Sequence, residues 1–341
     1  MMELLKNLCD LPGIPGREER VRTFIEKELE GSVDELRTDA LGNLIALKKT
    51  NRPDAKRVMV VAHMDEIGFY VKHIDEQGFL RVFNVGYFDT RQILAKQVLV
   101  SGRDADFVGV MNASIKPPHG TSEAERNHTP AIAELFIDLG LSAEEVKKHI
   151  RPGDMVTLKD NFVDLGQRVS SKALDDRVGC WVLMKTLQEL ESPSYDVYGV
   201  FSVQEEVGLR GAATSAYGLE PDLGIALDVT MALDIPGAKT EDQVSQLGNG
   251  VAIKVLDNRS ISTRWLVDEF IDLAEAKGTP YQLEVLTAGG TDAAPVQLSR
   301  AGVPSITLSI PCRYVHTVTE MVDKADLHAT VELLKNYLGS K

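Results

Sequence analysis

Two adjacent carboxylates, Glu205 and Glu206, follow an apolar run from Val197 to Val203 and precede a turn that contains Gly208. The apolar run predicts a buried strand, so the two carboxylates stand just past its end. Neighbouring side chains at such a place can divide the work, one binding a metal ion while the other accepts a proton from a substrate. The pair alone is weak evidence, because a solvated turn between a strand and a helix carries the same residue types.

Further residues suited to metal chemistry follow other predicted strands. His63 and Asp228 each come directly after an apolar run, and His316 stands a few residues beyond a third run. Asp65 lies two residues after His63, where a carboxylate can hold the second ring nitrogen of a metal-binding histidine. Residues 170–177, starting with Ser170 and Ser171, are predicted to open a helix. Asp175 lies in its first turn, where acidic residues also occur as ordinary capping residues. The three apolar runs are 58–62, 223–227 and 303–310.

This set of two imidazoles and several carboxylates suits two divalent ions joined by one bridging carboxylate. Mixed nitrogen and oxygen ligands accept several metals, so Zn²⁺ or Co²⁺ is favoured and Mn²⁺ stays open. The chain contains no His-Glu-x-x-His, no Gly-x-Ser-x-Gly, no phosphate-binding loop and no dinucleotide-binding glycine motif. The sequence therefore favours metal-assisted chemistry over the chemistries that those motifs carry out.

Two further histidines, His119 and His128, lie in a polar, proline-flanked segment at 116–130. No carboxylate accompanies them at the spacing of a metal site, so we interpret the segment as a solvated loop. The sequence leaves the role of this loop open.

The composition predicts a globular protein with a sizeable core, since 43% of the 341 residues are hydrophobic and 26% are charged. Acidic residues outnumber basic ones by 51 to 37, which gives a formal charge of −14. This charge argues against nucleic acid as a partner and suits a protein that gathers cations. We detect no signal peptide and no apolar run long enough for a membrane helix. Three scattered cysteines without a Cys-x-x-Cys pair indicate reduced thiols, and we expect a cytoplasmic protein.

Two patterns divide the chain. Residues 1–69 and 167–341 alternate apolar runs with amphipathic helical segments, which predicts an α/β domain with a mostly parallel sheet. Residues 70–166 contain short alternating segments separated by glycine and charged residues, which predicts a small β-rich domain inserted into the first. The N-terminal turn at 11–16 and the helix predicted after it are expected to serve packing, with no chemistry of their own.

With these residues the chain resembles the glutamyl aminopeptidase and TET-aminopeptidase family of di-metal exopeptidases, some members of which are labelled endoglucanases. The resemblance extends over nearly the whole chain and rests on five motifs. They are 62–68 (AHMDEIG), 172–177 (KALDDR), 203–211 (VQEEVGLRG), 289–293 (GGTDA) and 313–316 (RYVH). The resemblance implies a di-metal peptidase domain, an inserted PDZ-like dimerisation domain, and homo-oligomers in which dimers assemble into a tetrahedral dodecamer.

The resemblance also implies a metal-binding role for five residues. Asp175 would bridge two divalent ions, Glu206 and His316 would complete one site, and His63 and Asp228 would complete the other. Because both sites would share the charge of Asp175, its loss should release the paired ions.

The resemblance further implies which residues act on the substrate. Glu205 would be the general base, and Asp65 would orient a metal-binding histidine. Gly290, Thr291 and Asp292, which belong to a tight glycine turn, are predicted to contact the substrate.

Two positions depart from the family pattern. Asp176 stands where relatives can have Asn, and we do not assign it as a ligand. Thr317-Val318 follows His316 in place of the usual Ser-Pro, which is a mild change beside a ligand.

The function that the resemblance implies is metal-dependent removal of N-terminal residues from short peptides. The preferred N-terminal residue is left open, with neutral residues weakly favoured. A glycosidase of the endoglucanase type is one alternative, because it too needs paired carboxylates, although the neighbours Glu205 and Glu206 do not readily flank a sugar from opposite sides. A non-catalytic metal-dependent scaffold is the other, although such a protein would be expected to lack Glu205, and Glu205 is present.

Overall fold

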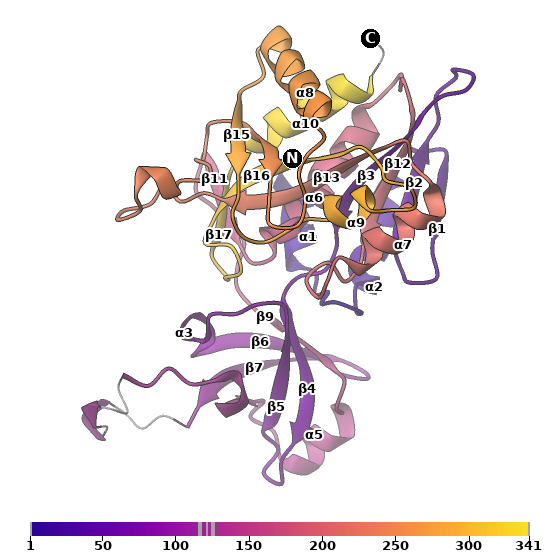
Figure 1. The fold of residues 1–341 in the computed structure, drawn as a ribbon. Coiled ribbons are helices and arrows are strands. Elements are labelled where there is room, and N and C mark those ends of the chain that lie inside the picture. Colours follow the sequence, from indigo (N-terminus) through magenta and orange to yellow (C-terminus); the bar gives the residue numbers. More distant parts are fainter. Residues whose placement is uncertain (1, 115–117, 121, 124–126, 340–341) are drawn as a thin grey trace.

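We describe a computed structural model of the chain, which covers residues 2–114, 118–120, 122–123 and 127–339. Part of the predicted loop at 116–130 therefore lies outside the described residues. The chain forms a large α/β lobe and a small β lobe, which are joined where the chain leaves and re-enters the large lobe (Figure 1).

The large lobe is built on a mixed sheet of eleven strands among the described residues. They are β1 (Glu35–Thr38), β2 (Leu44–Lys48), β3 (Arg57–His63), β10 (Val163–Asp164), β11 (Arg168–Ser171), β12 (Asp196–Ser202), β13 (Leu223–Met231), β14 (Val251–Leu256), β15 (Tyr281–Val285), β16 (Ser305–Arg313) and β17 (Glu320–Asp323). The central strands β12, β3, β13 and β16 are parallel to one another. The flanks are antiparallel, with β1 and β2 on one side and β17, β11 and β10 on the other. The predicted parallel arrangement is therefore found mainly at the centre of the sheet.

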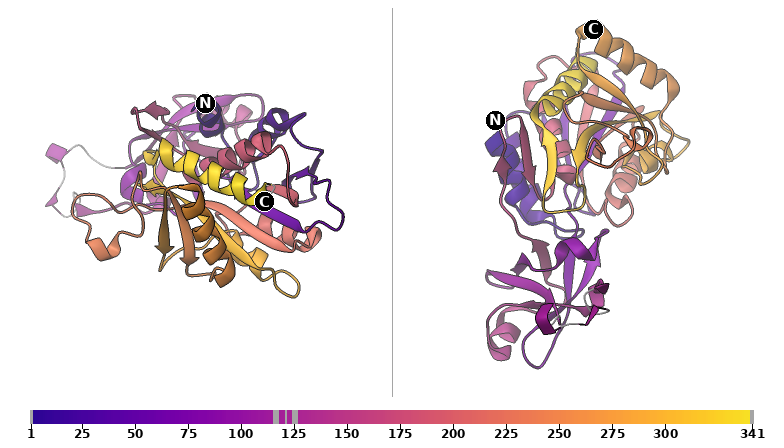
Figure 2. Two further views of the ribbon diagram at one scale, coloured as in Figure 1. Left: turned by 90° about the horizontal axis from the view of Figure 1, so that it is seen from above. Right: turned by 90° about the vertical axis from the view of Figure 1, so that its left-hand side faces the viewer.

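Helices cover both faces of this sheet. One face packs against α1 (Met2–Asp10), α2 (Glu19–Leu29), α6 (Leu174–Glu189), α8 (Arg264–Lys277) and α10 (Lys324–Leu338), and the other against α7 (Arg210–Leu219) and α9 (Ala293–Gln297). Figure 2 shows α10 in yellow lying along the large lobe. Val58 and Val60 of β3 contribute to the first core, while Met59 and Val61 contribute to the second. A strand with both faces covered explains why its sequence is apolar at every position.

The small lobe is a closed barrel with strand order β4-β5-β8-β7-β6-β9. Its elements are β4 (Gly68–Ile74), β5 (Leu80–Val85), α3 (Thr90–Ile93), β6 (Lys96–Ser101), β7 (Asp106–Ala113), β8 (Leu135–Asp138), α5 (Ala143–His149) and β9 (Met155–Leu158). Short 3₁₀ turns lie at Pro118–Gly120 and Ile132–Glu134 here, and at Thr240–Asp242 in the large lobe. The barrel strands pair in antiparallel fashion around a core of their own that includes Phe69 and Ile137. The predicted β-rich character of the insert is thus confirmed.

Two predicted boundaries near the site are wrong. Ser170 and Ser171 were expected to open a helix, but they belong to β11, because β17 offers them an antiparallel partner. The helix α6 begins only at Leu174. Asp228 was expected just past a strand, but β13 continues beyond it, because β16 extends equally far and pairs with it as far as Cys312.

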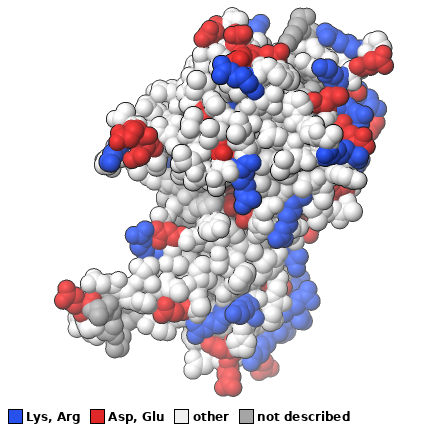
Figure 3. All heavy atoms as spheres, in the orientation of Figure 1, with Lys and Arg blue, Asp and Glu red and all other residues white. Residues whose placement is uncertain are grey.

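Acidic and basic side chains are interspersed on the face of the molecule drawn in Figure 3. In the part of the chain that the structure describes, no helix combines the length and apolarity needed to cross a membrane. The three cysteines are buried and free. Burial raises the pKa of the Cys9 thiol to about 12, which suits a residue that serves packing.

Candidate metal centre

The five predicted metal ligands lie together at one edge of the large sheet. His63 is the last residue of β3, and Asp228 lies near the end of its neighbour β13. Glu206 and His316 stand in the turns that follow β12 and β16. Asp175 lies at the start of α6, where its own backbone is not helical. Parallel strands expose their carboxyl ends at the same edge, which explains how residues far apart in the sequence meet here.

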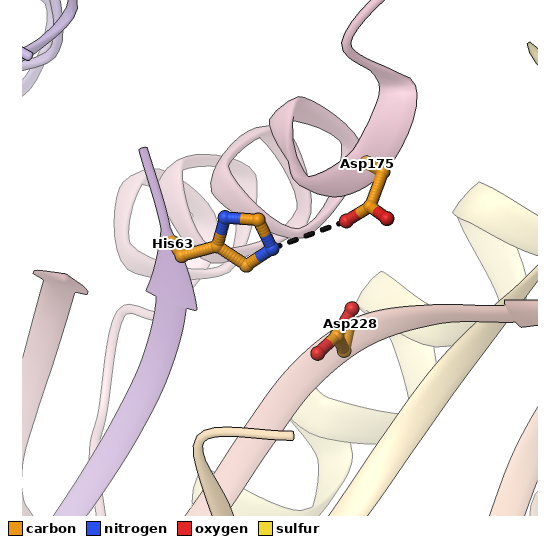
Figure 4. Close-up of side chains that lie close together, drawn as sticks. All are labelled: His63, Asp175 and Asp228. Atoms are coloured by element: carbon orange, nitrogen blue, oxygen red, sulfur yellow. Dashed lines mark hydrogen bonds and ion pairs between the residues drawn. The ribbon is translucent and has the colours of Figure 1, made fainter. Parts of the chain in front are cut away.

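Asp175 lies between two groups of side chains. Its Oδ1 is 3.1 Å from His63 Nε2, and its Oδ2 is 3.4 Å from His316 Nε2. Figure 4 shows His63, Asp175 and Asp228 facing one another. We call these three residues the His63 cluster, and Asp175, Glu206 and His316 the His316 cluster. Within each cluster the ligand atoms lie within 4.8 Å of one another.

The donor set of the clusters fits divalent transition metals. Each cluster offers one imidazole nitrogen and two carboxylates, which Zn²⁺, Co²⁺ and Mn²⁺ all accept. A carboxylate with one oxygen directed to each cluster has the arrangement of a bridge between two cations. The residues present therefore fit a pair of divalent ions, with Asp175 between them.

Asp65 connects the His63 cluster to the turn that carries the two glutamates. His63 Nδ1 lies 2.9 Å from the main-chain oxygen of Asp65 and 3.6 Å from its carboxylate. The carboxylate itself accepts hydrogen bonds from the main-chain N–H groups of Glu205 and Glu206, both at 3.1 Å. Asp65 is fully buried. The main-chain oxygen therefore makes the shorter contact with the ring, while the carboxylate holds the backbone of the turn.

Glu320 is a buried residue at the site that the sequence did not single out. One of its oxygens accepts a hydrogen bond from His316 N at 2.7 Å, and the other accepts one from Asp175 N at 3.1 Å. His316 has a φ of 64°, a left-handed conformation that a residue other than glycine keeps only where its surroundings hold it. The only sequence signal for Glu320 is a carboxylate four residues after the last predicted ligand, which is too common to be informative.

The site carries an excess of negative charge. Burial raises the pKa of Glu205, Glu206 and Asp228, and at Glu205 the neighbouring carboxylates add to this effect while His63 opposes it. Burial lowers the pKa of the histidines, but the carboxylates outweigh it and raise the pKa of His63 well above its usual value and that of His316 to about 12. The clusters therefore favour any positive charge, and divalent cations would compete with protons for the same side chains.

A cavity of about 770 Å³ opens over the clusters. Glu205 lines it, with Oε2 at 4.0 Å from His63 Nε2. Gly290 and Thr291, two of the predicted substrate contacts, also line the cavity. Asp292 is 2% exposed and lies behind them, where it accepts a hydrogen bond from Ser202 Oγ at 2.5 Å. Thus Glu205 and the glycine turn face the same open space.

Two cationic side chains, Lys254 and Arg259, also line the cavity. Lys254 is buried, and its Nζ lies 2.7 Å from the carboxylate of Glu284. Arg259 is exposed, and its aliphatic carbons lie against Gly290. A Cβ at Gly290 would come within 2.6 to 2.9 Å of these carbons, so glycine is needed for the Arg259 stem to cross the turn.

Sequence comparison relates the chain to aminopeptidases. A family model described as M42 glutamyl aminopeptidase matches residues 42–333. A protein named as a putative aminopeptidase from Acetivibrio thermocellus is 40% identical over 338 residues, which cover 98% of this chain and 97% of the relative. A lysyl aminopeptidase from Pyrococcus furiosus is 34% identical, with 98% of this chain and 96% of the relative covered.

The fold of the chain is also similar to solved structures of aminopeptidases and of a protein described as an endoglucanase. An aminopeptidase from the archaeon Desulfurococcus kamchatkensis superimposes with a TM-score of 0.94 at 40% identity, covering 100% of this chain and 94% of that one. The TET1 peptidase of Pyrococcus horikoshii, described as assembling into a tetrahedron or a large octahedral shell, gives 0.88 at 32% identity, covering 100% and 99%. A Thermotoga maritima protein described as an endoglucanase gives 0.81 at 34% identity, covering 98% and 96%.

Proposed function

The chain belongs to the M42 glutamyl aminopeptidase family and is a peptide hydrolase, and we propose that it removes N-terminal residues with two divalent cations and Glu205 as general base. The observation that carries this proposal is the position of Asp175, which directs one oxygen to each of two metal-ligand clusters. In this proposal Glu206 and His316 hold one ion together with Asp175, and His63 and Asp228 hold the other.

The chemistry of the proposed reaction is divided among the side chains at the cavity. Bound divalent cations would polarise the peptide carbonyl and lower the pKa of the attacking water. Glu205 accepts the proton of this water and returns it to the departing amine. Its carboxylate lies next to the His63 cluster, at 4.0 Å from His63 Nε2, without belonging to that cluster. The free α-amino group of the substrate is attracted to the acidic side chains of the site, which restricts cleavage to the first residue.

We propose Zn²⁺ or Co²⁺ as the native ions, with Mn²⁺ as the remaining candidate. The support is the donor set, since imidazole with carboxylate oxygens suits each of these ions. Gly290 and Thr291 are proposed to contact the substrate backbone or its first side chain, because they line the cavity beside the clusters. Asp292 would support them from behind the cavity wall.

We also propose that the chain forms a homo-oligomer, with dimers that contact each other through a PDZ-like insert and assemble into a tetrahedral dodecamer. The support is the similarity to the TET1 peptidase, which is described as assembling into a tetrahedron or a large octahedral shell. Light scattering coupled to size-exclusion chromatography measures the assembly directly. A monomer at micromolar concentration would refute this part of the proposal.

A glycosidase is less well supported than a peptidase. Glu205 and Glu206 lie on one turn, and both main-chain N–H groups bind the same Asp65 carboxylate. Two carboxylates that hydrolyse a glycosidic bond need to lie on opposite sides of the sugar. Neighbours held in this way do not readily meet that requirement.

The proposed function is tested with a panel of aminoacyl-p-nitroanilides, the same substrates with an acetylated amine, and a soluble cellulose. We expect hydrolysis of the free aminoacyl substrates only, abolished by a chelator and restored by a divalent metal. Cleavage of the acetylated substrates at a similar rate would refute the aminopeptidase assignment. Release of reducing sugar that resists the chelator would support the glycosidase instead.

A further inference from the structure

The turn that carries Glu205 and Glu206 is held at four consecutive main-chain N–H groups. Val203 N donates to the side chain of Asn43 at 3.0 Å, and Gln204 N donates to the carboxylate of Glu18 at 3.1 Å. The next two N–H groups donate to Asp65, as described above. Side chains from three separate segments therefore replace the strand partners that the backbone loses where β12 ends.

Gln204 is the residue of this turn that most needs such support. Its φ is 56°, in the left-handed region that residues other than glycine rarely adopt. Such a conformation persists only when neighbouring groups determine it. Gln204 directly precedes Glu205, so its backbone angles set the direction in which the Glu205 side chain leaves the turn.

Glu18 is placed to provide this support, and its side chain does not cap its own helix. It stands at the N-cap position of α2, yet its side chain makes no capping hydrogen bond to the helix. The same oxygen that accepts from Gln204 N also accepts from Gly16 N at 2.7 Å, and the residue is 4% exposed. A buried carboxylate oriented away from its own helix and onto the active-site turn is therefore part of the site's construction.

The segment that carries Glu18 is itself fixed to the site. The buried Arg177 guanidinium donates to the main-chain oxygens of Leu8, Leu11 and Met64. Tyr70, from the small lobe, donates its hydroxyl to Pro15 O at 2.7 Å. Both contacts reduce the freedom of the N-terminal turn, so that the position of Glu18 relative to Gln204 is well defined.

We propose that Glu18 is a positioning residue of the reaction, which holds the left-handed backbone of Gln204 and thereby directs Glu205 toward the scissile bond. The N-terminal turn then belongs to the catalytic apparatus, although it was expected to serve packing alone and lies outside the region matched by the family model. This inference rests on the proposed role of Glu205 as general base.

The test compares Glu18→Ala with Glu18→Gln in the full-length protein. A glutamine keeps a side-chain oxygen that can accept hydrogen bonds from both Gly16 N and Gln204 N. An alanine has no such oxygen, so both N–H groups lose this acceptor. We expect Glu18→Ala to lower kcat about 10- to 100-fold, as second-layer residues of metal sites do, with KM and bound metal per chain nearly unchanged. Glu18→Gln should restore most of kcat. The control is Glu19→Ala, which changes the exposed glutamate next to it.

Hydrogen–deuterium exchange of the peptide that spans 203–206 provides a readout that does not depend on the role of Glu205. We expect faster exchange there in Glu18→Ala and wild-type exchange in Glu18→Gln. An unchanged exchange rate, or an unchanged kcat despite faster exchange, overturns the proposal. Equal losses of kcat in Glu18→Gln and Glu18→Ala also overturn it, because they would trace the effect to charge. If Glu18→Ala does not fold, Glu18→Asp replaces it, since a carboxylate withdrawn by one methylene cannot keep both bonds.

The activity of Glu205→Gln, measured in parallel, separates the proposed general-base role of Glu205 from the proposed positioning role of Glu18. An active Glu205→Gln variant refutes the proposed general base, and with it the reason to position that side chain. An inactive Glu205→Gln variant together with a fully active Glu18→Ala variant refutes only the positioning role.

Discussion

The two clusters that share Asp175 are built in different ways. His63 and Asp228 lie on the neighbouring parallel strands β3 and β13 and are 2% and 7% exposed. Glu206 and His316 lie in turns beyond their strands, and the His316 side chain is 30% exposed. One cluster is thus placed by regular sheet structure and the other by irregular backbone.

Irregular backbone needs partners that the sheet does not provide. The N–H groups of Glu206 and His316 donate to the buried carboxylates of Asp65 and Glu320. Each of these carboxylates accepts two main-chain N–H groups. A single side chain therefore holds the backbone at each turn residue of the His316 cluster. Sheet pairing holds β3 and β13, and at His63 N the buried carboxylate of Asp176 adds one hydrogen bond at 3.3 Å. We expect substitutions to affect the two clusters unequally, with one exception.

The exception is Asp175, whose loss removes the difference between the clusters. We expect Asp175→Asn to lower the affinity of both ions and to reduce activity to the level of chelator-treated wild type, because the shared charge disappears. Elemental analysis after gel filtration measures the ions bound per chain. Two ions still bound per chain would contradict the bridging role.

The matched comparison for Asp175 is Asp176→Asn. Asp176 is fully buried, and both burial and Asp228 raise its pKa, so asparagine resembles the protonated side chain. It belongs to neither cluster, and its contact with the His63 cluster is a hydrogen bond that its Oδ2 accepts from the main-chain N–H of His63 at 3.3 Å. We expect this variant to keep both ions, so a loss of metal equal to that of Asp175→Asn would show that the assay reports general damage at the start of α6.

Glu205→Gln should lower turnover without affecting metal binding at either cluster. We expect kcat to fall by about 10²- to 10⁴-fold, the usual contribution of a general base, while two ions remain bound. Stopped or steady-state assays at saturating substrate give kcat, and elemental analysis gives the metal content. Activity within tenfold of the wild type would refute the role of Glu205. Glu220→Gln, a change at an exposed glutamate paired with Arg300, serves as the control.

The difference between the clusters also explains what the sequence could and could not predict. His63 and Asp228 could be found from apolar runs, because buried parallel strands have a distinct composition and end at a common edge. Glu206 and His316 could also be picked out from their positions after apolar runs, but only the family resemblance assigned them to one metal site. Glu320 was missed, because no local pattern distinguishes a carboxylate that binds distant N–H groups from one that is solvated. The mixed flanks of the sheet were missed for a similar reason, since pairing direction depends on chain reversals that composition does not encode.

A further prediction concerns the unequal support of the His63 and His316 clusters. We expect Glu320→Ala to lower the affinity for one ion about 10- to 100-fold, which is the usual cost of removing a supporting residue. The affinity for the other ion should fall less. The larger loss of affinity should be at the His316 cluster, because His316 loses the only side-chain contact described for its main-chain N–H. Titration of the metal-free protein with Zn²⁺ against a chromophoric chelator resolves the two affinities.

Two outcomes of this titration would contradict the comparison. Equal weakening of both ions would mean that Glu320 acts mainly through Asp175 N and not through His316 N. Unchanged affinities would mean that the turn carrying His316 keeps its position without Glu320. Glu332→Ala, which alters an exposed glutamate of α10, controls for changes in net charge.

The smallest expected effect concerns Arg259, which leaves both clusters intact and alters only the outer wall of the cavity. Whichever first residue the enzyme prefers overall, the exposed guanidinium should raise kcat/KM for an acidic first residue relative to a neutral one, since exposed charge pairs contribute about 0.2 to 1 kcal/mol. We therefore expect Arg259→Gln to lower the ratio of kcat/KM for glutamyl over leucyl p-nitroanilide about 1.4- to 5-fold. The wild-type ratio should also fall with added salt, because salt screens such contacts. Arg264→Gln, on α8 and paired with Asp268, is the control. A ratio that neither the substitution nor the salt changes would mean that Arg259 does not contact the first side chain, and that its role at Gly290 is to pack against the turn.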